Sequence, residues 1–273
     1  MAPPWRLVVD AAADGPWNMA VDETLLLACE DRAAPTLRLY GWNPATLSLG
    51  SRQEAARSHD PEFLRREGIA LVRRPTGGRA VLHERERTYA VVGRRDRWFP
   101  GGVLDTYRRI SLALQEAFRA LGVPAEIADA RARGAHSAGN PLCFASASAH
   151  EIVVGRRKLA GSAQLRARET FLQHGSILLA TDAGRLERAT GTPIHGVGFV
   201  GLDEVRGRAT TSDEIDGALV SAFESVFGNR FEAGRLSPDE ERTATRLRCW
   251  KYLSAAWTLG GRWGRRERRL SSQ

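Results

Sequence analysis

The feature that most constrains the fold of this chain is the way its short strand-like segments come in runs. Residues 36–42 and 45–50 alternate like paired strands around an Asn-Pro turn, and 69–74, 79–83 and 88–93 form a second run. Strict alternation of strands with helices would indicate a parallel sheet, and these runs break that alternation. The sequence therefore predicts an α+β fold with a mixed, largely antiparallel sheet flanked by helices.

Apolar residues at helical spacing mark the segments that should cover this sheet. The strongest helix is expected over 102–122, where Leu104, Ile110 and Leu114 fall on one side. In the helix expected over 14–32, Asp14 can cap the first turn. The other expected elements are a strand at 5–10, a short helix at 61–68, a hairpin at 151–166, a strand at 171–179, and helices at about 182–190, 212–227 and 238–256.

The charge balance of the chain indicates which partners its surface favours. Lysine and arginine number 40 against 32 acidic residues, which gives a net charge of +8. Such a surface attracts acidic partners such as nucleic acids, anionic lipids, acidic carrier proteins or phosphorylated ligands. The sequence shows no helix-turn-helix, RNP or zinc-finger signature, so a nucleic-acid partner is not expected.

The length of the apolar runs indicates where the protein is located, and the spacing of the cysteines indicates whether they form disulfides or a metal site. No apolar run approaches the ~20 residues that span a bilayer, and the first residues lack a signal-peptide pattern, so we expect a cytoplasmic protein with no membrane partner. The three cysteines, Cys29, Cys143 and Cys249, are far apart and odd in number. That spacing predicts neither a disulfide framework nor a metal site, and leaves a thiol available as a nucleophile.

The loop "RRPTGGRAVLH", residues 73–83, is the first candidate for chemistry. Its adjacent glycines permit unusual backbone angles and close approach of a ligand, and its arginines could add charged hydrogen bonds. It matches neither the P-loop nor the dinucleotide-binding pattern. From the residues alone, a binding loop and a hairpin turn with solvated arginines are equally good interpretations.

Two further segments place polar or small residues in strands. In "GRRKLAGSAQ", residues 155–164, Lys158 precedes three small residues that could lie against a ligand, although a single strand lysine is usually solvated. In "FLQHGSILL", residues 171–179, His174 interrupts an apolar strand, which is costly without a partner or ligand; a satisfied core histidine is the alternative.

The cysteines differ in their surroundings along the chain. Cys29 and Cys249 lie in helical patterns beside apolar residues, so we expect both to be buried fillers. Cys143 lies in "NPLCFASASAHEI", outside any apolar repeat, and is the candidate nucleophile. Four histidines are candidate bases for it, and the residues do not choose among them: His83, His136, His150 and His174.

Together, these segments resemble the lipoate-protein ligase, octanoyltransferase and biotin-ligase superfamily. "DGPWNMAVDETLL" looks like its opening helix, "TLRLYGWNPATLSLGSRQ" like its next strand pair, and the three segments above follow in the same order. The resemblance runs over residues 5–260. It implies the catalytic-domain fold of that superfamily for residues 1–260, followed by a basic tail at 261–273.

Within the superfamily, the resemblance is to the Cys-dependent octanoyltransferases of the ligase-like branch. "PLCFAS" places Cys143 where those enzymes carry their nucleophile, and Arg79 stands where ligases carry a third glycine, in space that an adenylate would need. The expected reaction moves an octanoyl group from octanoyl-acyl carrier protein through a Cys143 thioester to a lysine of a lipoyl-carrier protein. The acceptor would be a glycine-cleavage H protein or a dehydrogenase lipoyl domain. No cofactor is implied.

The resemblance also implies a set of site residues. Cys143 and Lys158 would be catalytic, with Lys158 near the acyl carbonyl. The residues expected to bind the acyl group are Arg73, Arg74, Thr76, Gly77, Gly78, Arg79, Ala80, His83, Gly161, Ser162, Ala163, Gln164, His174, Gly175 and Ser176. The alternatives are an ATP- and Mg²⁺-dependent lipoate-protein ligase on the same fold, a nucleic-acid-binding module, and a non-catalytic carrier-binding relative.

Overall fold

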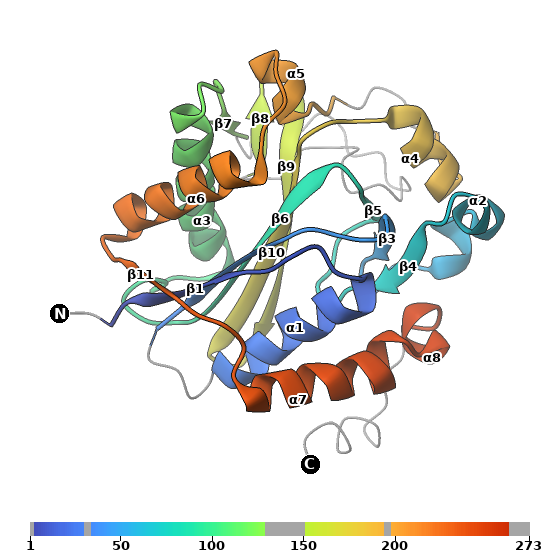
Figure 1. Ribbon diagram of the computed structural model, residues 1–273, viewed down its shortest axis with the longest axis horizontal. Coiled ribbons are helices and arrows are strands. Elements are labelled where there is room, and N and C mark those ends of the chain that lie inside the picture. The colour runs from blue at the N-terminus through green and yellow to red at the C-terminus, as the bar shows by residue number, and fades with distance from the viewer. Residues whose placement is uncertain (1–2, 30–33, 129–150, 194–197, 262–273) are drawn as a thin grey trace.

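A computed structural model gives the structure of the chain at residues 3–29, 34–128, 151–193 and 198–261 (Figure 1). Its centre is an eight-stranded sheet in the order β11-β1-β2-β6-β10-β9-β8-β7. The strands are β1 (Trp5–Val9), β2 (Thr36–Tyr40), β6 (Glu86–Arg94), β7 (Glu126–Ile127), β8 (Ile152–Val154), β9 (Arg157–Ala167), β10 (Thr170–Leu178) and β11 (Phe231–Ala233). Only the β11-β1 and β1-β2 pairings within this sheet are parallel, so the predicted mixed, largely antiparallel sheet is confirmed.

A smaller sheet of β4 (Ala70–Arg73), β3 (Thr46–Leu49) and β5 (Val81–His83) lies beside the large one (Figure 1). The predicted pairing of 36–42 with 45–50 is wrong, because β2 and β3 belong to different sheets. Both edges of β2 are occupied by β1 and β6, which leaves no edge for β3. The Asn-Pro segment therefore carries the chain from one sheet to the other.

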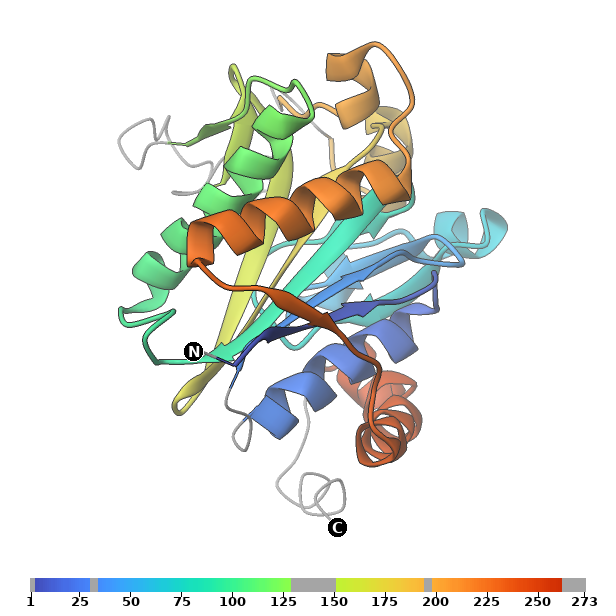
Figure 2. The same ribbon diagram turned by 60° about the vertical axis from the view of Figure 1, so that its left-hand side comes forward.

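Helices cover both faces of the large sheet (Figures 1 and 2). On one face, α3 (Val103–Ala120) and α6 (Ser212–Phe227) enclose an aromatic core around Trp5. On the other face lie α1 (Gly15–Ala28) and α7 (Pro238–Leu247). As predicted, Asp14 caps α1 by accepting a hydrogen bond from the backbone N–H of Trp17 at 2.7 Å.

The remaining elements correct several predicted boundaries. The helix expected over 238–256 ends at Leu247 and continues as a π-type turn, η4 (Arg248–Tyr252), and α8 (Ala255–Thr258). The first helix ends at Ala28, and β7, β11 and α5 (Leu202–Arg206) had no prediction, because elements this short carry little periodicity. The other short helices are η2 (Ala55–Arg57), α2 (Pro61–Arg66) and α4 (Ala183–Thr190).

None of the helices in the described ranges combines the length and the apolar character that a bilayer crossing needs. Residues 262–273 of the predicted basic tail lie outside the described residues.

Candidate active site

The glycine loop joins β4 to β5, which lie on opposite edges of β3. β3 pairs parallel with β4 and antiparallel with β5, so residues 74–80 must pass the end of β3. The loop is therefore not a hairpin turn, and that interpretation is wrong. It forms one end of the small sheet, where this sheet meets β10 of the large one through the side chains described below.

Arg73, which the sequence placed among the acyl-binding residues, holds the protein backbone. Its side chain is 1% exposed, and Nη1 donates to the carbonyl oxygens of Gly50 and Gln53 at 2.7 Å. Nε donates to the carbonyl of Trp257 at 2.9 Å, which fastens α8 to β4. Arg73 does not line the pocket described below. The solvated-arginine interpretation is therefore wrong for this residue, and ligand contact by Arg73 stays a prediction.

The guanidinium group of Arg74 holds the glycine loop together by hydrogen bonds to the loop backbone. Nη1 donates to the Ser48 hydroxyl at 3.0 Å, and Nη2 donates to the carbonyls of Gly77 at 2.8 Å and Arg79 at 2.7 Å. The side chain is buried. A guanidinium has five N–H donors, and these bonds direct several of them to protein oxygens rather than to an anion. The loop is shaped by Arg74 from within.

Gly50, at the end of β3, allows the glycine loop to approach that strand. A Cβ atom on Gly50 would lie 1.9 Å from the carbonyl oxygen of Gly78, whose φ is +90°. Only glycine fits a contact this close, since a methyl group would displace the loop backbone.

We expect Gly50→Ala to lower the free energy of unfolding by about 2 kcal/mol, because the methyl group must push the loop away. Gly77→Ala is the matched control in the same loop, since a Cβ there meets nothing within 4 Å. Urea unfolding of both variants checks this. Equal free energies of unfolding for the two variants would show that the loop backbone moves away from residue 50 at no cost.

The lysine segment and the histidine segment, noticed separately in the sequence, are neighbours in the sheet. β9 and β10 pair antiparallel so that Gly161 faces Ser176, Ser162 faces Gly175 and Ala163 faces His174. A Cβ on Gly175 would lie 2.6 Å from the Ser162 hydroxyl oxygen, so this small-residue wall is tightly packed.

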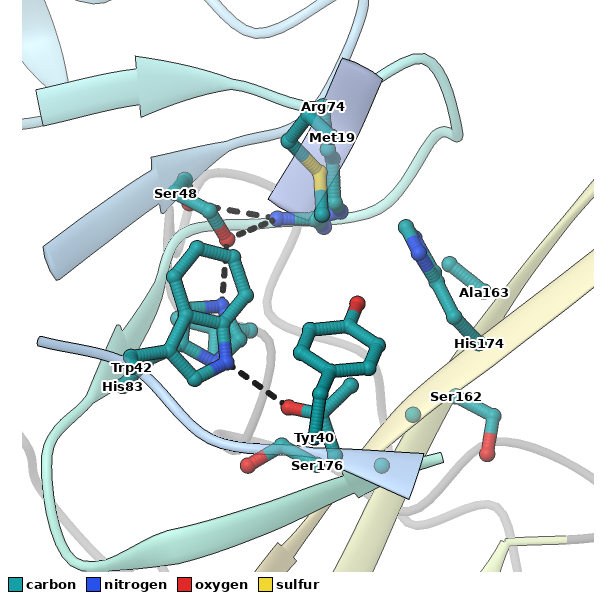
Figure 3. A pocket seen from close by; sticks show the side chains of 14 residues that line it. Met19, Tyr40, Trp42, Ser48, Arg74, His83, Ser162, Ala163, His174 and Ser176 are labelled. Atoms are coloured by element: carbon teal, nitrogen blue, oxygen red, sulfur yellow. Dashed lines mark hydrogen bonds between the residues drawn. The ribbon is translucent and has the colours of Figure 1, made fainter. Parts of the chain in front are cut away.

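A pocket lies between this wall, α1, β2 and the small sheet (Figure 3). Its empty space, including the part that is open to solvent, is about 360 Å³. Eight of the predicted residues line it: Arg74, His83, Gly161, Ser162, Ala163, His174, Gly175 and Ser176. The sequence interpretation missed six others: Met19, Tyr40, Trp42, Ser48, Val81 and Thr88. Val81 lies in the glycine loop that the sequence singled out, but it was taken as an apolar strand residue. The other five come from segments whose pattern indicated only core strands or a core helix, so no local signal singled them out. The predicted residues Thr76, Gly77, Gly78, Arg79, Ala80, Gln164 and Lys158 do not line this pocket.

A buried hydrogen-bonded chain runs behind the pocket from α1 to the glycine loop. The Asp22 carboxylate contacts Arg38 Nη1, the Tyr40 hydroxyl and His174 Nδ1, each at 2.8 Å, and His174 Nε2 lies 2.7 Å from the Thr76 hydroxyl. Burial would raise the pKa of Asp22, but the His174 hydrogen bond and the Arg38 charge hold it below its usual value.

This ionised state of Asp22 assigns the protons on His174. A carboxylate only accepts, so His174 Nδ1–H donates to Asp22, and in the neutral ring Nε2 accepts from the Thr76 hydroxyl. His174 is thus a satisfied core histidine that also lines the pocket. Both of its nitrogens are occupied by protein, which fixes the ring against Thr76 of the glycine loop.

His83 is the second imidazole at the pocket. Its ring stacks on Trp42 with centroids 3.9 Å apart, and Nε2 lies 2.8 Å from the Ser48 hydroxyl (Figure 3). Burial lowers the pKa of His83, which keeps the ring neutral near pH 7. Nδ1 makes no hydrogen bond to the described residues and lies 3.6 Å from Glu86 Oε2.

Lys158 is 1% exposed, so the interpretation of a solvated strand lysine is wrong. Its Nζ lies 2.5 Å from Oε1 of Glu151, which is itself 4% exposed. Glu151 directly follows residues 129–150, which lie outside the described residues and include Cys143, His136 and His150. The roles predicted for Cys143 and Lys158 stay predictions.

The other two cysteines behave differently from each other. Cys29 is buried, as expected, whereas Cys249 is exposed, so its prediction as a buried filler is wrong. Cys249 lies in η4 next to Trp250, which is 48% exposed, so this part of the turn faces solvent rather than the core. Among the residues that the structure describes, no group of three His, Cys, Asp or Glu side chains could hold a metal ion.

Comparison with known proteins identifies the protein family to which this chain belongs. The model of the family described as "Lipoyl protein ligase A/B catalytic domain" matches residues 14–224. The chain belongs to this family.

Within this family, the chain is similar to curated proteins that are named octanoyltransferases. The chain is 40% identical over 268 residues to the protein "Octanoyltransferase LipM" of Kyrpidia tusciae, covering 93% of this chain and 97% of that one. It is 37% identical over 269 residues to "Octanoyltransferase LipM" of Bacillus subtilis, with the same coverage of both chains.

Solved structures share the fold. A putative lipoate protein ligase from T. acidophilum with bound lipoic acid superposes with a TM-score of 0.81 at 23% identity, covering 94% of this chain and all of that one. A lipoate-protein ligase A bound with ATP gives 0.79 at 23% identity, over 95% of this chain and all of that one. At such identities the likeness establishes the fold alone.

Proposed function

We propose that this chain is an octanoyltransferase of protein lipoylation, which moves an octanoyl group from octanoyl-acyl carrier protein to a lysine of a lipoyl-carrier protein. The relatives named octanoyltransferases, each covered almost end to end, support the reaction. The single structural observation that carries the proposal is the pocket between the β9-β10 wall and α1.

The pocket suits a medium-length acyl chain. Met19, Trp42 and Val81 offer apolar surface, and Gly161 and Gly175 line the pocket with backbone alone. Each methylene buried there contributes about 0.8 kcal/mol, so binding can discriminate chain length.

The proposed chemistry is acyl exchange between thiols followed by transfer to an amine. A Cys143 thiolate attacks the thioester carbonyl of the donor, the carrier thiolate leaves, and the acyl group is then carried on Cys143. Activation stays in the thioester, so the reaction needs neither ATP nor a metal ion. Lys158, held by Glu151 at 2.5 Å, would supply the cation that favours the thiolate and the tetrahedral oxyanion.

The charge of the chain suits both protein substrates. A net charge of +8 attracts acidic carrier proteins and speeds their association, an effect that salt weakens. We propose octanoyl-acyl carrier protein as the donor, and a glycine-cleavage H protein or a dehydrogenase lipoyl domain as the acceptor.

Intact-mass measurement of the full chain mixed with octanoyl-acyl carrier protein tests this function. We expect the protein to gain one octanoyl group, which is released by hydroxylamine, in the absence of ATP and Mg²⁺. An acyl-enzyme that forms only from free acid and ATP, with pyrophosphate released, would instead establish a ligase.

A further inference from the structure

Glu86 is a buried carboxylate at the junction between the acyl pocket and the surface. It is 8% exposed, and it accepts a hydrogen bond from the Thr88 hydroxyl at 2.8 Å; Thr88 in turn accepts from Trp42 Nε1 at 2.8 Å. Thr88 and Trp42 line the acyl pocket, whereas Glu86 itself lines a separate cavity that opens beside α4. A charge so nearly buried needs partners, and the structure gives Glu86 the Thr88 hydroxyl and, at 3.6 Å, His83 Nδ1.

Strand register places Glu86 at the same end of the pocket as Lys158. Glu86 faces Leu178 across β6-β10, and Ile177 faces Ala160 across β10-β9, so Lys158 lies two residues beyond Ala160 toward that end. One strand, β10, separates the two residues, which corresponds to roughly 10 Å between the outer backbones. His174 and Ala163 lie toward the other end of the same wall. Glu86 is therefore on the side where the reacting carbonyl is proposed to lie.

The cavity beside α4 connects this end of the sheet to solvent. It is lined in part by Phe199, whose neighbours Gly198 and Val200 hydrogen-bond to the backbone of Lys158. Its carboxylates are Glu84, Glu86 and Asp182, and its arginines, Arg85 and Arg185, are both paired with acidic side chains. Because Glu84 is one of the partners of Arg185, the three carboxylates exceed the two arginines by one charge, and this small excess favours an ammonium group over a phosphate.

An unpartnered buried nitrogen faces the same carboxylate. His83 Nδ1 makes no hydrogen bond to the described residues, and its distance of 3.6 Å from Glu86 Oε2 is too long for one. A cationic donor between them could bond to both. The Ser48 hydroxyl at His83 Nε2 can accept as well as donate, so Nδ1 is able to present a lone pair. The charged or titratable groups acting on His83 are Glu86, Arg74 and His174.

We propose that Glu86 and His83 form the site for the acceptor amine: the lysine of the lipoyl-carrier protein enters through the cavity beside α4 and loses a proton there. This inference rests on the function proposed above. The ammonium gives one proton to His83 Nδ1, and the amine nitrogen bonds to the acyl carbon. The carbon–sulfur bond to Cys143 then breaks, and the second proton of the nitrogen goes to the departing thiolate. Glu86 binds the ammonium and then stabilises the imidazolium.

Separate measurement of the two half-reactions tests this site. The full chain is first loaded from octanoyl-acyl carrier protein and then mixed with the apo form of a glycine-cleavage H protein, and both steps are followed by intact mass. At pH 7 we expect His83→Gln to slow transfer to the acceptor about 100-fold and Glu86→Gln about tenfold. Loading is measured in parallel because His83 also lines the acyl pocket, and for both variants transfer should fall several-fold more than loading does, since no amine takes part in loading. Asp213→Asn, an exposed carboxylate outside the cavity beside α4, is the matched control.

The pH dependence separates a proton acceptor from a merely structural pair. The transfer defect of His83→Gln should narrow toward pH 9, because the lysine, with a pKa of about 10.4, then loses its proton to solvent more often. Equal slowing of loading and transfer, or unchanged transfer, would overturn the proposal. So would a wild-type transfer rate that rises about tenfold per pH unit up to pH 9, a result that needs no variant. Failure of the wild type to load would instead refute the octanoyltransferase function.

Discussion

Cys143→Ser is expected to abolish octanoyl transfer, with a loss of at least about a thousandfold. A serine hydroxyl is far less acidic than a thiol and is almost never ionised near pH 7, so it cannot exchange with a thioester at a useful rate. The measurement is octanoylation of an apo lipoyl domain from octanoyl-acyl carrier protein, together with the intact mass of the enzyme. No octanoyl adduct should form on the variant.

Cys249→Ser is the control for this experiment, because Cys249 is an exposed thiol that reagents can reach. It should retain wild-type loading and transfer. If Cys143→Ala transferred octanoyl groups as fast as wild type, the thioester mechanism would be excluded. If Cys249→Ser abolished loading instead, the nucleophile would be Cys249 of η4 rather than Cys143.

Asp22→Ala should lower the free energy of unfolding by about 3 kcal/mol. The carboxylate is fully buried and contacts Arg38, Tyr40 and His174, so its removal leaves a buried guanidinium with less compensation and two unpaired polar groups. Urea unfolding at pH 7 measures this cost. Since His174 would also lose the bond that orients it toward Thr76, the pocket wall should loosen.

Asp10→Ala is the matched control on the same guanidinium. Asp10 contacts Arg38 Nε at 2.7 Å but is 30% exposed, so its loss should cost only about 1 kcal/mol. Equal costs for the two variants would contradict the importance of burial at Asp22.

Ionisation of Asp22 should also make the free energy of unfolding depend on pH. Its pKa in the folded protein is below the ordinary value of 3.8. The ionised group therefore stabilises the fold above the pKa of the unfolded chain, and this contribution disappears as the pH falls through the lower folded value. Asp22→Ala should lose less stability than wild type between about pH 5 and pH 2. Parallel acid unfolding curves would contradict this assignment.

Local patterns in the sequence were sufficient for the class of fold and for most long elements. The 18-residue helix α3 was recognised from apolar residues at helical spacing on one face. The strands β6 and β10, which are buried on both faces, were recognised from their apolar runs. The glycine loop, the small residues after Lys158 and His174 also stood out, since each breaks the pattern of its own segment.

The role of each of these residues was decided only by tertiary contacts. Arg73 and Arg74 read as ligand-binding cations along the chain, yet their hydrogen bonds go to backbone carbonyls from β3, the loop and α8. The pocket residues Met19 and Tyr40 sit in ordinary core patterns, and a pattern does not reveal which core side chains border an empty space.

What the sequence by itself determined about this protein is its mixed sheet and the residues that interrupt its regular elements, because both follow from local spacing. The tertiary structure alone decided that β2 and β3 lie in different sheets, that the small residues of β9 face the His174–Ser176 segment of β10, and that Glu86 and Lys158 lie toward the same end of the wall. These relations depend on strand order and register, which are set by burial of whole faces against partners distant in the chain.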